Sequence, residues 1–107
     1  MEYGGVHGEH WNDVDGNPAG GTTYGRGFTI GWQNGPLGRG EDRKIPNGAF
    51  VEEVIEAAID RLEYYQSSKF ACDRNSEAIV HLDSALVELR ARTSDREKRE
   101  VEGTHAQ

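Results

Sequence analysis

The stretch FVEEVIEAAIDRLEYY, residues 50–65, decides the fold because its apolar side chains recur at steps of three and four residues. That period is typical of a helix with one buried face. Glu52 and Glu53 stand in its first turn, where the helix dipole favours acids, and Arg61 comes late, where it favours bases. Asn47 is the predicted N-cap. The stretch therefore predicts a long amphipathic helix. Its apolar stripe consists of Val51, Val54, Ile55, Ala58, Ile59, Leu62 and Tyr65.

A second helical period follows the segment SSKFACDRN, residues 67–75. Two amphipathic helices joined by a short connection form an antiparallel hairpin in which the two stripes face each other. Past Leu89 the stripe stops, so a helix that continues there has no partner within one copy of the chain. The second stripe consists of Ala78, Ile79, Leu82, Ala85, Leu86 and Leu89.

The N-terminal part, residues 1–46, is rich in glycine and has no helical period. Its clearest signal is the run FTIGWQ, residues 28–33, where large apolar and smaller residues alternate as in a half-buried strand. Asn34-Gly35 then indicates a tight turn. Because a lone strand is unstable, a partner is expected from residues 2–7 or residues 43–46.

Composition indicates the number of domains, the oligomeric state and the cellular compartment. With 107 residues, 35% of them hydrophobic, the chain is expected to be one α+β domain and to associate into a homo-oligomer, since its core is small. Residues 1–46 would form a small N-terminal antiparallel β-sheet packed on the helix hairpin of residues 47–107, which ends in a basic segment. A single cysteine and the lack of an apolar leader favour the cytosol.

Two function classes are disfavoured at this level. No apolar run approaches the roughly 20 residues that cross a bilayer, so no membrane partner is predicted. The formal net charge of −7 argues against broad affinity for nucleic acid, and any bound anion is expected to be small and locally recognised.

A calcium loop is suggested by Asp13, Asp15 and Asn17, which stand at alternate positions. An EF-hand loop needs glycine at its sixth position and an acid at its twelfth, but here those residues are Pro18 and Tyr24. A turn closed by its own polar side chains is the preferred interpretation.

Other candidates for metal binding or catalysis are weak. His7 and His10 lie in a glycine-rich stretch that lacks the rigid spacing of a helical zinc motif. Cys72 has no companion cysteine, and His81 falls within the second helical period. We therefore predict no metal, no cofactor and no catalytic set.

Two arginine-bearing segments could bind phosphate. In GPLGRGEDRK, residues 35–44, glycines free the backbone to turn its N–H groups toward an anion, and Arg39 and Arg43 could add bidentate contacts. A surface loop with solvated arginines explains this segment equally well. The second segment, RARTSDREKR, residues 90–99, gathers five of the twelve Lys and Arg residues. It is either a solvated helix with charge pairs at three- and four-residue spacing or a phosphate-binding set.

Several segments carry a resemblance to a known family: GRGFTIGWQNGPLGRG, RLEYYQ, FACDRNSEAIVHLDSAL and RTSDREKREVEGTH. With these segments the chain resembles the phage anti-Thoeris sponge family. Its helical part is similar to the hairpin shared with the phage anti-CBASS cyclic-dinucleotide sponges. The resemblance covers most of the chain from about residue 24 onward.

The resemblance implies a non-enzymatic inhibitor of bacterial immunity that acts in the cytoplasm of the infected bacterial host. Such a protein binds, without degrading it, a cyclic ADP-ribose isomer that a TIR enzyme makes from NAD. Related sponges also bind cyclic dinucleotides and trinucleotides. The family pattern further implies a dimer or a hexamer with ligand pockets between protomers.

The resemblance also implies roles for individual residues. Phe70 would stack on a base, and Asn75 would hydrogen-bond a base or ribose. The residues implied in phosphate contact are Arg92, Thr93, Arg96 and Arg99, with Arg39 and Arg43 as further members.

Three other functions stay open from the sequence. The first is a nucleic-acid-binding module that uses the arginine-rich segment. The second is a small nucleotide hydrolase that would have to rely on His7, His10, Asp13 and Asp15. The third is a helix-hairpin oligomer without a ligand.

Overall fold

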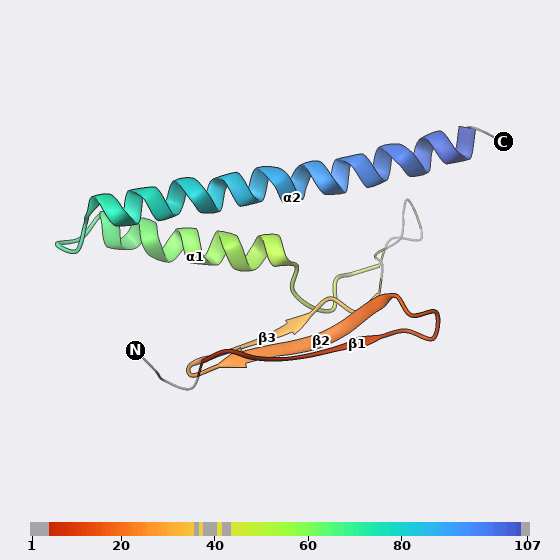
Figure 1. Cartoon of the computed structure of the whole chain (residues 1–107), viewed down its shortest axis with the longest axis horizontal. Helices are drawn as coiled ribbons and strands as arrows, with labels where there is room; N and C mark the ends of the chain where they lie inside the picture. The colour runs from red at the N-terminus through yellow and green to blue at the C-terminus, as the bar shows by residue number, and fades with distance from the viewer. Residues whose placement is uncertain (1–4, 36, 38–40, 42–43, 106–107) are drawn as a thin grey trace. The chain divides into compact units, whose positions relative to one another are not determined.

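The chain forms three strands followed by two helices in a computed structural model (Figure 1). The structure describes residues 5–35, 37, 41 and 44–105, and for residues 100–105 the backbone alone. It divides into two compact units, one up to Phe50 and one from Val51 onward, which are described separately below. No helix within these described ranges has the length and hydropathy of a membrane-spanning segment.

The first unit is a three-stranded antiparallel sheet in the order β1-β2-β3. β1 (His7–Asn12) pairs with β2 (Pro18–Gly25), and β2 pairs with β3 (Phe28–Trp32). The predicted strand at residues 28–33 is thus confirmed as β3, and the predicted antiparallel sheet is confirmed with it. Its predicted partner was wrong, because β3 pairs with β2, a strand that the sequence pattern does not predict.

Glycine explains why β2 escaped prediction. Its sequence, PAGGTTYG, has low strand propensity, yet the close approach of β1 requires glycine there. A Cβ at Gly21 would lie 2.5 Å from the backbone carbonyl oxygen of Glu9. The two-residue turn into β3 likewise depends on Gly27, whose φ is 91°.

The segment before the first helix lies beside the end of β3. Ala49 forms a parallel bridge with Trp32. The side-chain amide of Asn47 accepts a hydrogen bond from Asn34 N–H (2.8 Å) and donates one to the Asn34 carbonyl oxygen (3.1 Å). Asn47 is therefore not the N-cap that the sequence predicted, since the helix begins four residues later and the amide is engaged with the strand end.

The second unit is the predicted helix hairpin, which is confirmed. α1 (Val51–Gln66) and α2 (Asp73–His105) contact each other along their apolar stripes. Within the described residues, only Ile59 and Leu86 fall in the buried apolar class, at 9% and 4% exposure. At 1.5 Å per residue, α1 is about 24 Å long and α2 about 50 Å. Figure 1 shows α2 running well past the start of α1.

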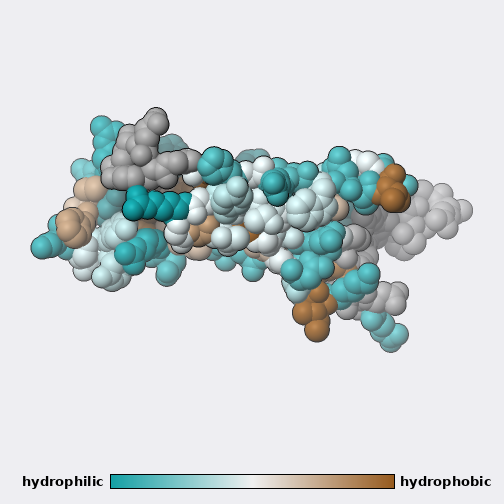
Figure 2. All heavy atoms as spheres, turned by 90° about the horizontal axis from the view of Figure 1, so that it is seen from below, coloured by the Kyte–Doolittle hydropathy of each residue, from teal (hydrophilic) through white to brown (hydrophobic). Residues whose placement is uncertain are grey.

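Most of the larger apolar side chains stay partly in solvent. The face drawn in Figure 2 is largely hydrophilic, with hydrophobic residues standing apart from one another. The exposed large hydrophobic residues are Val6, Trp11, Val14, Tyr24, Phe28, Ile45, Val51, Tyr64, Phe70, Val80 and Val87. The small core expected from composition is therefore what the described residues form.

The inner face of the hairpin can be tested with Leu86→Ala. This substitution should lower the free energy of unfolding by about 2–4 kcal/mol, because it removes a buried side chain and leaves a cavity. Urea denaturation measures the loss. Val80→Ala on the same helix is the control, since Val80 is 55% exposed and should change stability by less than about 0.5 kcal/mol. Equal losses in both variants would contradict the observed packing.

Candidate functional site

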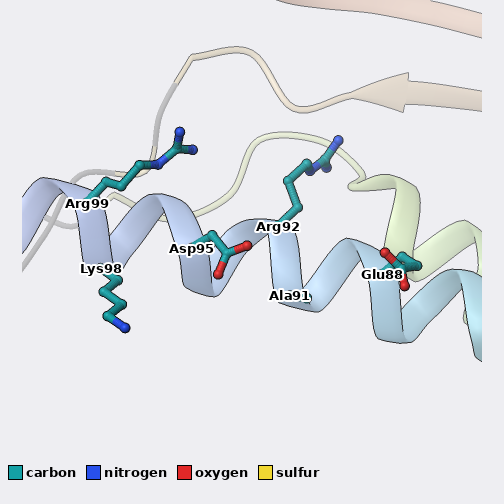
Figure 3. A pocket seen from close by; sticks show the side chains of 6 residues that line it. All are labelled: Glu88, Ala91, Arg92, Asp95, Lys98 and Arg99. Atoms are coloured by element: carbon teal, nitrogen blue, oxygen red, sulfur yellow. The ribbon is translucent and has the colours of Figure 1, made fainter.

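A cavity of about 530 Å³ that is widely open to solvent lies along the C-terminal half of α2. Figure 3 shows that Arg92 and Arg99 extend to the same side of the helix and Lys98 to the opposite side, with Asp95 between the two arginines along the helix. Steps of four, three and four residues join Glu88, Arg92, Asp95 and Arg99, which places all four on one face. The described residues that line the cavity are Glu88, Ala91, Arg92, Asp95, Lys98 and Arg99.

Two charged residues that line this cavity have no ion-pair partner among the described residues of the hairpin. In the described part of the chain, the side chains of Arg92 and Asp95 make no hydrogen bond or ion pair, although Arg99 stands four residues after Asp95. For residues 90–99 the sequence offered a solvated helix with charge pairs along it: the side chains are mostly exposed, but no such pair forms among those that the structure describes. Arg90 instead reaches across to α1, where its guanidinium contacts the Glu56 carboxylate at 2.7 Å.

The structure divides the phosphate-binding set that the resemblance implied. Arg92 and Arg99 line the cavity. Thr93 is half-buried, and its hydroxyl donates to the Leu89 carbonyl oxygen at 3.2 Å. Arg96 is exposed and is not among the described lining residues. Arg39 and Arg43 lie outside the described residues.

Four lining residues were not predicted as site residues: Glu88, Ala91, Asp95 and Lys98. Three of them carry charged side chains. A signal for them existed in the sequence, because the spacing that joins Arg92 to Arg99 on one helical face also includes Asp95 and Glu88. The predicted set named only cations and a hydroxyl from this segment and left out its acids.

The connection between the helices presents Phe70 to solvent. Its side chain is 67% exposed, while its backbone N–H donates to Ser68 Oγ at 3.1 Å and its carbonyl oxygen accepts from Asn75 Nδ2 at 3.2 Å. The Lys69 ammonium lies 5.6 Å from the ring centroid. The ring is thus accessible on a backbone that is fixed on both sides.

Gln66 is the centre of the hydrogen bonds that close this connection. Its Nε2 donates to the Cys72 carbonyl oxygen at 3.0 Å and to Ser76 Oγ at 2.7 Å. Its Oε1 accepts from Cys72 N–H and from Asn75 Nδ2, each at 3.0 Å. The amide of Asn75, implied as a ligand contact, therefore also holds the turn together.

Two tyrosines surround a guanidinium near the end of α1. The Arg61 guanidinium lies 4.9 Å from the ring centroid of Tyr64 and 5.0 Å from that of Tyr65. The hydrogen bond from Arg61 Nε to the Tyr65 hydroxyl, 3.2 Å long, raises the pKa of Arg61 above its usual value. The group is therefore a permanent cation.

The structure also bears on the weaker candidates. Asp13 accepts hydrogen bonds from the N–H groups of Asp15 and Asn17, at 2.9 and 3.0 Å, which closes a polar turn. His7 and His10 are three residues apart on β1, so they point to opposite faces of the sheet. Among the described residues, no group of three His, Cys, Asp or Glu side chains is placed to hold a metal ion.

Comparison with known proteins identifies the family. Residues 25–94 match the family described as Acb2/Tad1, hairpin domain. The chain belongs to this family. The resemblance found in the sequence is thereby confirmed, and the matched region includes β3, α1 and the part of α2 up to residue 94.

One relative with a curated description is a protein named Thoeris anti-defense 1 from Bacillus phage SBSphiJ7. It is 43% identical over 77 residues, which cover 72% of this chain and 51% of the relative. The chain thus spans about half the length of that relative.

The double role of Asn75 can be tested by Asn75→Ala. Because the substitution removes two hydrogen bonds at the turn, it should lower the free energy of unfolding by about 1–2 kcal/mol. Thermal unfolding monitored by circular dichroism measures the change. Arg74→Ala, at the exposed neighbouring position, should leave stability nearly unchanged. An Asn75→Ala protein as stable as the wild type would mean that these hydrogen bonds do not hold the turn.

Proposed function

We propose that the protein is a phage anti-defence protein that binds and sequesters an anionic nucleotide-type messenger without degrading it. The preferred messenger is a cyclic ADP-ribose isomer made by a bacterial TIR enzyme. Cyclic dinucleotides and trinucleotides are further candidates. Membership of the Acb2/Tad1 hairpin family and the name of its phage relative support the anti-defence role.

The observation that carries the proposal is the pair of unengaged guanidinium groups in the cavity on α2. Arg92 and Arg99 each offer a planar fork of N–H donors that matches two phosphate oxygens. Neither fork is occupied by a carboxylate within the described residues, although Asp95 is near both in sequence. The site therefore keeps donor capacity for an external anion.

Phe70 supplies the second kind of contact that such a ligand needs. An exposed ring on a fixed backbone is a suitable surface for a base to stack on, which contributes about 1–3 kcal/mol per base. We propose this role for Phe70 and a base or ribose contact for Asn75. Thr93, Arg96, Arg39 and Arg43 stay predicted phosphate contacts.

A sequestering protein must compete with the receptor of the messenger. A Kd near 1 nM corresponds to about 12 kcal/mol. Charge-assisted hydrogen bonds contribute about 1.5–3 kcal/mol each, and this strength requires that water be kept out. Arg92 and Arg99 are exposed in one protomer, so a second copy must cover them for such affinity.

We propose accordingly that the protein works as a homo-oligomer, a dimer or a hexamer. The distal part of α2 extends beyond α1, and within the described residues the hairpin buries only Ile59 and Leu86. A long helix with so little cover is stabilised by packing against a further element. We place the protein's action in the cytoplasm of the infected bacterium, where the messenger is made.

The proposed function is tested by isothermal titration of the purified protein with a TIR-generated cyclic ADP-ribose isomer. We expect tight binding, and heat release followed by mass spectrometry should recover the ligand unchanged. A chemically altered ligand would show that the protein is an enzyme. Binding of oligonucleotides with length-dependent affinity and steep salt dependence, in place of the messenger, would favour a nucleic-acid-binding module.

The cavity assignment is tested by Arg92→Ala. Loss of a bidentate phosphate contact should weaken binding of the isomer by about 1.5–3 kcal/mol, roughly a 10- to 150-fold rise in Kd. Arg90→Ala is the matched control, because it removes the same charge from the same helix but from the side that contacts Glu56. A similar loss in both variants would show a general electrostatic effect instead of a defined contact.

A further inference from the structure

The cavity on α2 contains carboxylates beside its phosphate-binding cations. Arg92 and Arg99 extend to one side of α2, whereas the ammonium of Lys98 extends to the opposite side (Figure 3), and the lining also includes Glu88 and Asp95. The two guanidinium groups are thus matched in number by two carboxylates. A cavity built for phosphate alone would gain nothing from the two acids, because each repels a bound anion.

Asp95 is the acidic residue that lies between the two arginines of the cavity. It follows Arg92 by three residues and precedes Arg99 by four along α2. The expected explanation, that Asp95 neutralises one of these arginines, does not hold for the described residues, where Asp95 has no ion pair.

Two other roles for the acids fail on the structure. A metal site would need at least a third ligand, and the described residues hold no such group of His, Cys, Asp and Glu. A capping role is also ruled out, since Glu88 and Asp95 stand in the middle of α2, far from its first turn at Asp73.

What remains is the chemistry of an ionised carboxylate, which accepts hydrogen bonds and donates none. The complement of two carboxylate oxygens is a pair of adjacent donors, and a ribose diol beside a phosphate has that arrangement. We propose that Asp95, assisted by Glu88, binds ribose hydroxyl groups and makes the cavity selective for a phosphate-bearing ligand that has free ribose hydroxyls. This inference rests on the proposed function of the same cavity.

The acids then act in two directions. They accept hydrogen bonds from the hydroxyl groups of the correct ligand, and they repel phosphate compounds that lack donors. Selectivity of this kind combines an attractive contact with a repulsive one. It would keep the cavity from filling with inorganic phosphate or pyrophosphate, which the arginines alone would also bind.

The test is Asp95→Asn, assayed with two ligands by isothermal titration. Binding of the TIR-generated cyclic ADP-ribose isomer should weaken about ten-fold, because a charge-assisted hydrogen bond becomes a neutral one. Binding of inorganic pyrophosphate should instead become stronger, because a repelling charge is removed. The melting temperature should stay the same, since Asp95 is exposed and unpaired within the described residues.

Glu97→Gln is the matched control, because it removes the same charge two residues away and Glu97 is not among the described lining residues. It should not move the two affinities in opposite directions. Glu88→Gln should repeat the Asp95→Asn pattern more weakly.

The outcomes separate this inference from the function on which it rests. A wild-type protein that does not bind the isomer overturns both. If the wild-type protein binds the isomer and the Asp95→Asn variant binds both ligands more tightly, the acids only repel phosphate. That result overturns the inference alone. The inference is also overturned, and the proposed function kept, if neither affinity changes in that variant.

Discussion

The pairing of two helices of unequal length is the constraint on which the rest of the hairpin depends. α1 has 16 residues and α2 has 33, so the shared apolar seam can hold only part of α2. Burial of Ile59 and Leu86, with half-buried neighbours, fixes the two helices against each other. Beyond that seam, most of the described side chains of α2 up to residue 99 are exposed.

Polar contacts set the geometry at the closed end of the same hairpin. The Gln66 side chain uses both its oxygen and its nitrogen to hold the connection between the helices. Because these hydrogen bonds involve short, directional contacts, they fix the backbone around Phe70 while its ring stays in solvent. One hairpin thus carries an exposed aromatic ring on its turn and a charged cavity on the distal part of its longer helix, about 28 Å from the start of α2 at 1.5 Å per residue.

Only one of the three strands of the sheet was predicted from the sequence pattern. β3 was predictable because Phe28, Ile30 and Trp32 alternate with smaller residues. β2 was not predictable, because glycine has a low strand propensity. The close approach of the β1 backbone nevertheless requires glycine at Gly21. The N-cap prediction for Asn47 failed for a related reason: its amide suits a helix N-terminus, but a strand end thirteen residues earlier engages it instead.

The sequence by itself determined the helix hairpin, the position of its apolar stripes and the family, because periodicity and motif order are properties of the linear chain. The cluster of arginines was also visible there. Only the tertiary structure decided which of these charges stay available: Arg90 is engaged with Glu56 on the other helix, whereas Arg92 lines a cavity and has no ion pair among the described residues. The reason is physical, since ion pairing and exposure depend on which groups of distant residues are brought within a few ångströms, and periodicity along one helix does not contain that information.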